Sequence, residues 1–167
     1  LNWLDYSFQD ARAKVQLLDE MGMGIWVMEP LRGGKLVKLD EKYEKMLRAL
    51  RPDESNHSFA FRFLQSVPEV TMTLSGMSTL EQIKDNIEIY STEKPLNEKE
   101  WKTLLEIADE LVAPNRLPCT ACRYCTEVCP QEIPIPELFS AVNAKRSDQP
   151  YTGIDMDSQC IKCGRCE

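Results

Sequence analysis

The chain has 167 residues, enough for one ordinary domain or for part of a larger domain with an appendage. Its formal net charge of −7 disfavours nucleic acid as a partner, because phosphate contacts need clustered Lys and Arg, and the sequence shows no such cluster. The sequence has neither an apolar run approaching about 18 residues nor a secretory leader, so it predicts no membrane span and a cytoplasmic location.

The first part of the chain alternates strand and helix patterns. Residues 1–6 begin abruptly with a short apolar run, which predicts the end of a strand. Residues 25–28 are a continuous apolar run, typical of a strand buried on both faces of a parallel sheet, and we expect Trp26 in the core. Between them a helix is predicted that ends at the glycines of residues 21–24. Its apolar face comprises Phe8, Ala11, Val15 and Leu18.

Two helices and another strand are predicted after the glycine-containing loop of residues 29–36. The first helix ends at Pro52, and the second follows Ser55 and Asn56, either of which can cap it, and ends at Pro68. Residues 70–74 then form a strand. The apolar positions that these helices bury are Tyr43, Met46, Leu47, Leu50, Phe59, Phe63 and Leu64.

Two further helices precede the cysteine-rich end. Ser78 and Glu81 fit a capping box, in which each side chain satisfies the other residue's backbone donor. The apolar stripe of the helix that follows comprises Leu80, Ile83, Ile87 and Tyr90. Asn97 is expected to cap the last helix. The apolar positions of that helix are Trp101, Leu104, Leu105, Ala108, Leu111 and Val112.

The alternation of strands and helices predicts parallel βα units and therefore an α/β fold. The predicted strands are too few to close a barrel or to cover a parallel sheet, so we expect residues 1–114 to be the C-terminal portion of a larger α/β domain. Prolines 114 and 118 bracket a short linker. Residues 115–167 are therefore predicted to be a second domain.

The strongest chemical signal lies in residues 119–130. This run holds three cysteines at intervals of three, a fourth cysteine four positions later, and then a proline: Cys119, Cys122, Cys125, Cys129 and Pro130. Bacterial iron–sulfur proteins hold 4Fe–4S clusters with this spacing. Three such thiolates converge on one cluster, whereas the fourth cysteine ligates the other cluster in two-cluster ferredoxins.

The end of the chain supplies a second triplet, Cys160, Cys163 and Cys166. If the ligands cross over, Cys129 completes the cluster of this second triplet. The fourth ligand of the first triplet is then expected three positions beyond Glu167. We therefore expect a ferredoxin-type domain that is truncated at its C-terminus.

Disulfides and zinc are the alternatives for these thiols. The odd total of 7 cysteines, the intervals of three and the lack of a signal peptide favour reduced thiols. Zinc usually takes two C-x2-C pairs with a spacer, whereas this sequence holds two triplets. The pattern therefore favours iron–sulfur clusters, with zinc as the remaining alternative.

Outside the cysteines, the notable stretches are LNWLDY at 1–6, VMEPLRGGKL at 27–36 and LSGMS at 74–78. They resemble the later strands of the aldo/keto reductase family. With the cysteines, the chain resembles the branch that fuses a reductase (β/α)8 barrel to a C-terminal ferredoxin-type domain with two 4Fe–4S clusters. The resemblance covers nearly the whole chain and implies that its strands are the sixth, seventh and eighth of a TIM barrel.

The resemblance also implies a nicotinamide dinucleotide site at the carboxyl ends of the strands. It places Leu31, Gly33 and Gly34 beside the pyrophosphate or the nicotinamide. The residues implied around the adenosine are Ser75, Gly76, Met77, Gln82, Asp85 and Asn86. Arg32 and Lys35 are either within reach of a cofactor phosphate or exposed loop residues.

Some positions depart from the family pattern. Members that select the 2′-phosphate commonly have a lysine after the eighth strand and an arginine in the next helix, where this chain has Gly76 and Gln82. Met28 stands where an aromatic ring often stacks on the nicotinamide. NADH and NADPH therefore both stay open, as does a flavin as intermediate carrier. The single histidine, His57, matches no catalytic motif and is predicted to be a surface or capping residue.

The resemblance implies an enzyme. In the full-length protein, NAD(P)H would exchange hydride with a small carbonyl or alcohol, and the clusters would pass electrons to or from a redox partner protein. The family's catalytic Asp, Tyr, Lys and His come from earlier strands, so these residues alone are expected to be inactive. One alternative is an electron-transfer ferredoxin-type module on a non-catalytic barrel remnant, and another is a purely structural metal domain.

Overall fold

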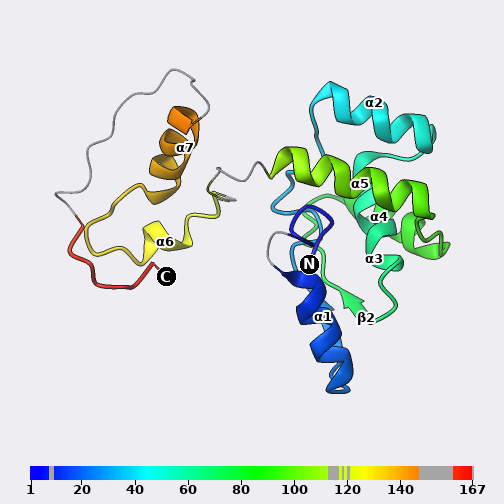
Figure 1. Cartoon of the computed structure of the whole chain (residues 1–167), viewed down its shortest axis with the longest axis horizontal. Helices are drawn as coiled ribbons and strands as arrows, with labels where there is room; N and C mark the ends of the chain where they lie inside the picture. The colour runs from blue at the N-terminus through cyan, green and yellow to red at the C-terminus, as the bar shows by residue number, and fades with distance from the viewer. Residues whose placement is uncertain (8–9, 113–116, 118, 120, 147–159, 167) are drawn as a thin grey trace. The chain divides into compact units, whose positions relative to one another are not determined.

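The computed structural model describes residues 1–7, 10–112, 117, 119, 121–146 and 160–166 (Figure 1). The chain divides into two compact units, Leu1–Val112 and Ala113–Glu167. Most of the linker that was predicted between the prolines at 114 and 118 lies outside the described residues.

The sheet of the first unit has two parallel strands, β1 (Ile25–Val27) and β2 (Val70–Thr73). Trp26 lies opposite Met72, and the backbone N–H of Leu74 continues the pairing by donating to the carbonyl of Val27 at 2.9 Å. The connection between the strands contains α2 (Glu41–Leu50) and α3 (Asn56–Gln65). The general α/β class is therefore correct, but the described residues form no barrel.

The strand predicted at residues 1–6 is wrong. Residues 3–7 form turns, although the amino group of Leu1 lies beside the end of β1 and donates to the carbonyl of Met28 at 3.3 Å. The side-chain oxygen of Asn2 accepts from the backbone N–H of Asp5 at 3.0 Å. Such a local side-chain hydrogen bond gives the backbone an alternative to sheet pairing, so this segment folds back on itself.

Three more helices complete the first unit. α1 (Ala11–Glu20) precedes β1, and α4 (Leu80–Ser91) and α5 (Glu98–Leu111) follow β2. α5 packs beside α2, and α4 packs beside α3 (Figure 1). The predicted helices at these places are confirmed, although Phe8, expected on the first of them, lies outside the described residues.

The core of this unit lies on one face of the sheet. Ile25 and Val27 point into it from β1 and are buried. α3 contributes Phe59 and Phe63, which are fully buried, and every residue of this helix from Ser58 to Leu64 is buried. The ring of Trp101 on α5 stacks on Phe63 with a centroid distance of 4.7 Å. The helices on this side therefore fix the position of the sheet.

The opposite face of the sheet is exposed and apolar. We call it the uncovered sheet face, and it comprises Trp26, Met28, Met72 and Leu74. Trp26 is 63% exposed, so the expectation of a core Trp26 in a strand buried on both faces is wrong. Alternate residues of a strand point to opposite faces, but their polarity alone does not tell whether anything covers each face.

The apolar stripe predicted on α4 also faces outward. Leu80 is 65% and Ile87 is 63% exposed, whereas Ile89 is buried instead. Of the predicted stripe, Tyr90 contacts α3, where its ring meets that of Phe61 with a centroid distance of 5.5 Å, whereas Leu80 and Ile87 face outward.

The second unit contains α6 (Tyr124–Glu127) and α7 (Ile135–Arg146), which contact each other. Asn143 on α7 accepts from the backbone N–H of Leu117 at 2.7 Å and donates to its carbonyl at 2.9 Å, which joins the start of the unit to this helix. Within the described part of the chain, every helix is too short or too polar to cross a membrane.

Candidate functional site

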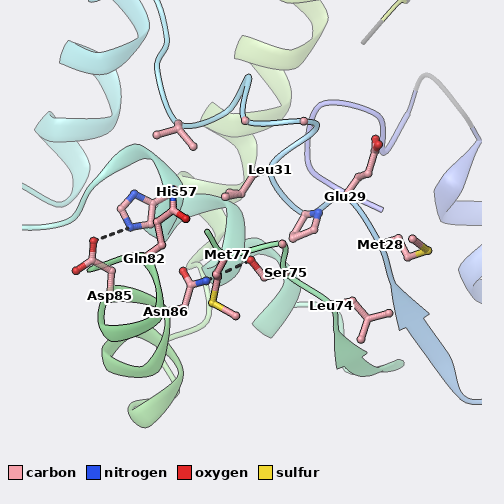
Figure 2. Close-up of a pocket in the computed structure, with 15 residues that line it drawn as sticks. Met28, Glu29, Leu31, His57, Leu74, Ser75, Met77, Gln82, Asp85 and Asn86 are labelled. Atoms are coloured by element: carbon pink, nitrogen blue, oxygen red, sulfur yellow. Dashed lines mark hydrogen bonds and ion pairs between the residues drawn. The ribbon is translucent and has the colours of Figure 1, made fainter. Parts of the chain in front are cut away.

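A cavity of about 640 Å³ opens at the carboxyl ends of β1 and β2 (Figure 2). Its walls come from the loop after β1, the loop after β2, the start of α3 and the first half of α4. In open α/β sheets, ligands bind at this end of parallel strands, because the loops there converge. The residues that line the cavity are Met28, Glu29, Pro30, Leu31, Gly33, Gly34, Val37, His57, Leu74, Ser75, Gly76, Met77, Gln82, Asp85 and Asn86.

All the residues predicted to contact a dinucleotide line this one cavity. Those on the loop after β1 are Leu31, Gly33 and Gly34. Those on the loop after β2 and on α4 are Ser75, Gly76, Met77, Gln82, Asp85 and Asn86. Sequence reasoning missed that His57 joins them, since nothing in the sequence shows that the start of α3 reaches this end of the sheet. Contact with a cofactor stays a prediction.

The loop after β1 has an unusual backbone. Glu29 and Arg32 have φ values of 52° and 49°, in the left-handed region that non-glycine residues rarely adopt, and Gly33 and Gly34 follow at 63° and 85°. Left-handed residues persist only where the surroundings hold them. The buried N-terminal segment holds this loop, because the side-chain amide of Asn2 donates to the carbonyl of Glu29 at 3.3 Å.

Arg32 is the centre of this attachment. Its Nε lies 3.0 Å and 3.1 Å from the two carboxylate oxygens of Asp5, and both side chains are buried. Asp5 also accepts from the amide of Asn2 at 2.9 Å. Arg32 therefore forms an internal ion pair, and the alternative of an exposed loop position is wrong for it, whereas contact with a cofactor phosphate stays a prediction.

The start of α4 is capped differently from the prediction. The capping box is formed by Thr79 and Gln82, one residue later than the predicted pair of Ser78 and Glu81. The amide oxygen of Gln82 accepts from the backbone N–H groups of Ser78 at 2.8 Å and Thr79 at 3.3 Å. Both registers fit the sequence pattern, so only the geometry distinguishes them. Gln82 thus shapes the cavity wall by fixing the helix start.

Polar side chains from two helices meet at one side of the cavity. Figure 2 shows the ring of His57 facing the carboxylate of Asp85, with Nε2 and Oδ2 4.0 Å apart. The amide of Asn86 donates to the hydroxyl of Ser75 at 3.2 Å and joins α4 to the loop after β2. His57 also contacts the hydroxyl of Ser55, the N-cap of α3, at 3.0 Å. The predicted location of His57 near a helix cap is therefore correct, but the residue lines the cavity as well.

The cysteines lie in the second unit. Cys125 is on α6, and the other members of the first run lie on loops either side of it; the residues of the second triplet are exposed. Among the described residues, no group of three or more His, Cys, Asp or Glu is placed to hold a metal ion. The structure therefore does not bring either triplet together, and the predicted ligand sets stay predictions.

Residues 118–167 match the family model of the 4Fe-4S dicluster domain. This part of the chain is a 4Fe–4S dicluster domain. The first cysteine run and the second triplet both lie within the matched stretch. No curated protein matches the chain, and no solved structure matches it.

The backbone of the dicluster domain fits the binding of clusters. Counted from the first cysteine of each triplet, the residues at +2 and +4 are left-handed in both: Ala121 and Arg123 at 59° and 66°, Lys162 and Gly164 at 53° and 72°. The Sγ of Cys119 accepts from the backbone N–H of Ala121 at 3.4 Å. Hydrogen bonds to sulfur and an all-thiolate donor set are features of 4Fe–4S sites. The two triplets therefore share the same pattern of left-handed backbone positions.

An ion pair supports the first triplet from outside. The guanidinium of Arg123, between Cys122 and Cys125, pairs with the carboxylate of Glu137 on α7. Arg123 has a left-handed backbone, and its side chain ties that strained turn to the helix. This contact joins the turn of the first triplet to α7.

Proposed function

We propose that the chain is part of an iron–sulfur oxidoreductase of the aldo/keto reductase type. The first unit binds NAD(P)H in the cavity at the carboxyl ends of β1 and β2, and the full-length protein transfers hydride between this cofactor and a small carbonyl or alcohol. When the hydride moves from an alcohol to NAD(P)⁺, the two electrons of the NAD(P)H so formed pass one at a time through the dicluster domain to a redox partner protein in the cytoplasm, and the reverse flow regenerates NAD(P)H for carbonyl reduction.

One observation carries the proposal: the residues that the family resemblance assigns to the dinucleotide all line one cavity, in a chain that also holds a dicluster domain. These residues come from two separate segments of the sequence, 31–34 and 75–86. The volume of about 640 Å³ lies within the range of pockets that bury small ligands, roughly 300–1,000 Å³.

The uncovered sheet face supports the barrel part of the proposal. Parallel sheets occur almost only with both faces covered, and side chains such as Trp26 and Met72 fill the interior when such a sheet closes into a barrel. Further strands of a (β/α)8 barrel would bury these side chains. In the full-length protein, the side chains of the uncovered sheet face and of the α4 stripe would then be buried.

The electron count is compatible with two clusters. Oxidation of NADH to NAD⁺ and a proton releases two electrons, and each 4Fe–4S cluster takes one. A flavin is the class of carrier that accepts a pair of electrons and passes them on singly.

The test uses the full-length protein with its clusters reconstituted under anaerobic conditions. We expect NADH or NADPH to bleach the visible absorption of the clusters, and a carbonyl substrate to be reduced. Dithionite serves as a reductant that does not need the cavity. If dithionite reduces the clusters and neither dinucleotide does, the oxidoreductase proposal is wrong.

A cavity variant makes this test specific. A Cβ built on Gly76 meets no atom within 4 Å, so Gly76→Trp places a ring in open cavity space and not in the core. We expect this variant to lose bleaching by dinucleotide and to keep reduction by dithionite. If the dinucleotide bleaches the clusters of the variant and of the wild type equally, electrons reach the clusters from a site other than this cavity.

The second candidate function is an electron-transfer module on a non-catalytic barrel remnant. The match of residues 118–167 to the dicluster domain favours it, because that match alone accounts for electron transfer. Normal reduction by dithionite, normal exchange with a redox partner and no response to dinucleotide would identify this function.

A further inference from the structure

We infer that electrons leave the dicluster domain at the second triplet, and that the redox partner docks there through an acidic face. The inference rests on the proposed function, since it names the kind of partner that the clusters serve. It comes from the charges that the two triplets carry between their cysteines.

The two triplets share a backbone pattern but differ in charge. Between its first and last cysteines, the second triplet holds Lys162 and Arg165 and no acidic residue. The first triplet holds Arg123 as its single charged residue over the same interval, and the guanidinium of Arg123 pairs with the carboxylate of Glu137. The second triplet is therefore the basic one, whereas the charge of the first is compensated within its own unit.

Both cations of the second triplet are available to a partner. Lys162 and Arg165 are exposed, and within the described part of the chain neither side chain pairs with a carboxylate. Ile161 precedes them and is 61% exposed. Protein interfaces commonly surround an apolar centre with a polar rim, and these residues offer both. We call Ile161, Lys162 and Arg165 the basic patch.

The basic patch is interleaved with the thiols of one predicted cluster. Lys162 stands between Cys160 and Cys163, and Arg165 stands between Cys163 and Cys166. A partner that contacts these side chains therefore lies beside ligands of that cluster, so an electron has a short path between the two proteins. Net charge near a cluster affects its reduction potential, and positive charge favours the form that has gained an electron. Electrons are therefore expected to collect at the second triplet.

The charge of the partner follows from the basic patch and not from the chain as a whole. The net charge of −7 would favour a basic partner, whereas the patch favours an acidic one. At about 0.1 M salt the Debye length is about 10 Å, so distant charges are largely screened and the charges at the contact decide. The expected partner is an electron-transfer protein with carboxylates around its own redox group.

The experiment measures how fast the reduced full-length protein, with both clusters reconstituted, loses electrons to small oxidants of opposite charge. Dithionite reduces the clusters and is then removed. The oxidants are the anion tris(oxalato)cobaltate(III) and the cation hexaamminecobalt(III), and in each one electron from a cluster converts Co(III) to Co(II). We expect the rate with the anion to fall as salt is added and the rate with the cation to rise. A flavodoxin with an acidic surface is the protein probe and is expected to behave as the anion does.

Substitutions locate the effect. Lys162→Gln and Arg165→Gln each remove one charge of the basic patch, and we expect each to lower the rates with the anion and with the flavodoxin severalfold, at equal iron content. Lys162 has a left-handed backbone and Arg165 does not, so Arg165→Gln tests the patch even if the turn at Lys162 does not tolerate substitution. Lys145→Gln is the matched control, because Lys145 is exposed in the same unit but lies on α7, outside both triplets.

Two results overturn the inference. One is a rate that falls with salt for the cation and rises with salt for the anion, since the net charge of the chain then decides. The other is a change in the patch variants no larger than that in Lys145→Gln. Neither result involves the cavity, because dithionite supplies the electrons. Failure of NAD(P)H to bleach the clusters would instead overturn the aldo/keto reductase proposal and leave these rates unaffected.

Discussion

At the scale of single residues, the buried ion pair of Asp5 and Arg32 holds the loop that forms one wall of the cavity. Only 9% of each side chain is exposed. Removing one partner of a buried pair leaves the other charge without compensation, which costs about 3 kcal/mol or more. We therefore expect Arg32→Ala to lower the unfolding free energy of the first unit by about 3 kcal/mol. Urea unfolding followed by tryptophan fluorescence reports this unit alone, because all 3 tryptophans lie in it.

Lys45→Ala is the control for this prediction. Lys45 pairs with Glu41 at 2.7 Å, but the two side chains are 72% and 81% exposed, and such surface pairs contribute less than about 1 kcal/mol. Losses of similar size in Arg32→Ala and Lys45→Ala would contradict the assignment of Arg32 as the residue that holds the loop.

The residues of the cavity and those of the ion pair differ in how far the sequence predicts them. Leu31, Gly33 and Gly34 were predicted, because a sequence motif carries them. The ion pair of Arg32 was not predicted, because its partner Asp5 lies 27 positions away and no local sequence pattern indicates that the two side chains meet. His57 was missed for the same reason, since only the packing of α3 beside α4 brings it to Asp85.

At the scale of elements, the start of α4 offers a direct comparison of two capping assignments. In the structure the hydroxyl of Thr79 accepts from the backbone N–H of Gln82 at 3.3 Å. Thr79→Ala is expected to cost about 1 kcal/mol in urea unfolding, whereas Ser78→Ala is expected to cost much less. The variant with the larger loss of unfolding free energy identifies the capping residue. A larger loss for Ser78→Ala would support the predicted capping box of Ser78 and Glu81.

A buried carboxylate joins the end of α2 to the start of α5. Glu100 accepts from Nε and Nη2 of Arg51, both at 2.7 Å, and from the backbone N–H of Asn97 at 2.8 Å. The hydrogen bonds from Arg51 hold the pKa of the Glu100 carboxyl below its ordinary value, against the opposite effect of burial. A carboxyl with a lowered folded-state pKa contributes stability above its unfolded pKa, about 4.3, and loses it as the pH falls through the folded pKa.

We therefore expect the first unit to lose stability as the pH is lowered from about 6 to about 3.5, and Glu100→Gln to show a smaller loss over the same window. Urea unfolding at each pH, again followed by tryptophan fluorescence, gives the slope of the unfolding free energy against pH for the wild type and for Glu100→Gln. Parallel slopes would mean that Glu100 does not contribute to the acid sensitivity.

The elements themselves were largely predictable, and their surroundings were not. Periodicity and caps identified α2, α3 and α5 with their buried side chains, because those patterns are local. The same patterns gave no information on which faces are covered, so Trp26 was assigned to the core and is exposed, and the patterns do not show that Leu80 and Ile87 of the α4 stripe are exposed as well. The strand predicted at residues 1–6 was wrong because the hydrogen bonds of Asn2 compete with sheet pairing.

At the scale of the whole molecule, the first unit has a well-packed interior and two apolar surfaces, the uncovered sheet face and the outward stripe of α4. A parallel sheet with an apolar open face is rare in isolation. The carboxyl ends of the strands nevertheless form a defined cavity, because the loops are fixed by contacts within the unit: Arg32 to Asp5, and Asn86 to Ser75. The two loop walls of the cavity are therefore held from within the unit, whereas Met28 and Leu74 belong both to the cavity lining and to the uncovered sheet face.

The dicluster domain carries the last prediction, which concerns how the cysteines are shared. Cys129 follows the first triplet closely in sequence, but ligand crossover in two-cluster domains would assign it to the cluster of Cys160, Cys163 and Cys166. In the full-length, reconstituted protein we expect Cys129→Ala to lose the same electron paramagnetic resonance signal as Cys163→Ala, with about four iron atoms fewer per chain. Cys122→Ala is expected to lose the other signal.

The comparison of these three variants decides between crossover and local ligation. Each removes one thiol from the same domain, so a general loss of folding would affect both signals in all of them. Crossover requires the spectrum of Cys129→Ala to coincide with that of Cys163→Ala. If it coincides with that of Cys122→Ala, the run of residues 119–129 holds a single cluster by itself, and the second triplet needs its fourth ligand from elsewhere.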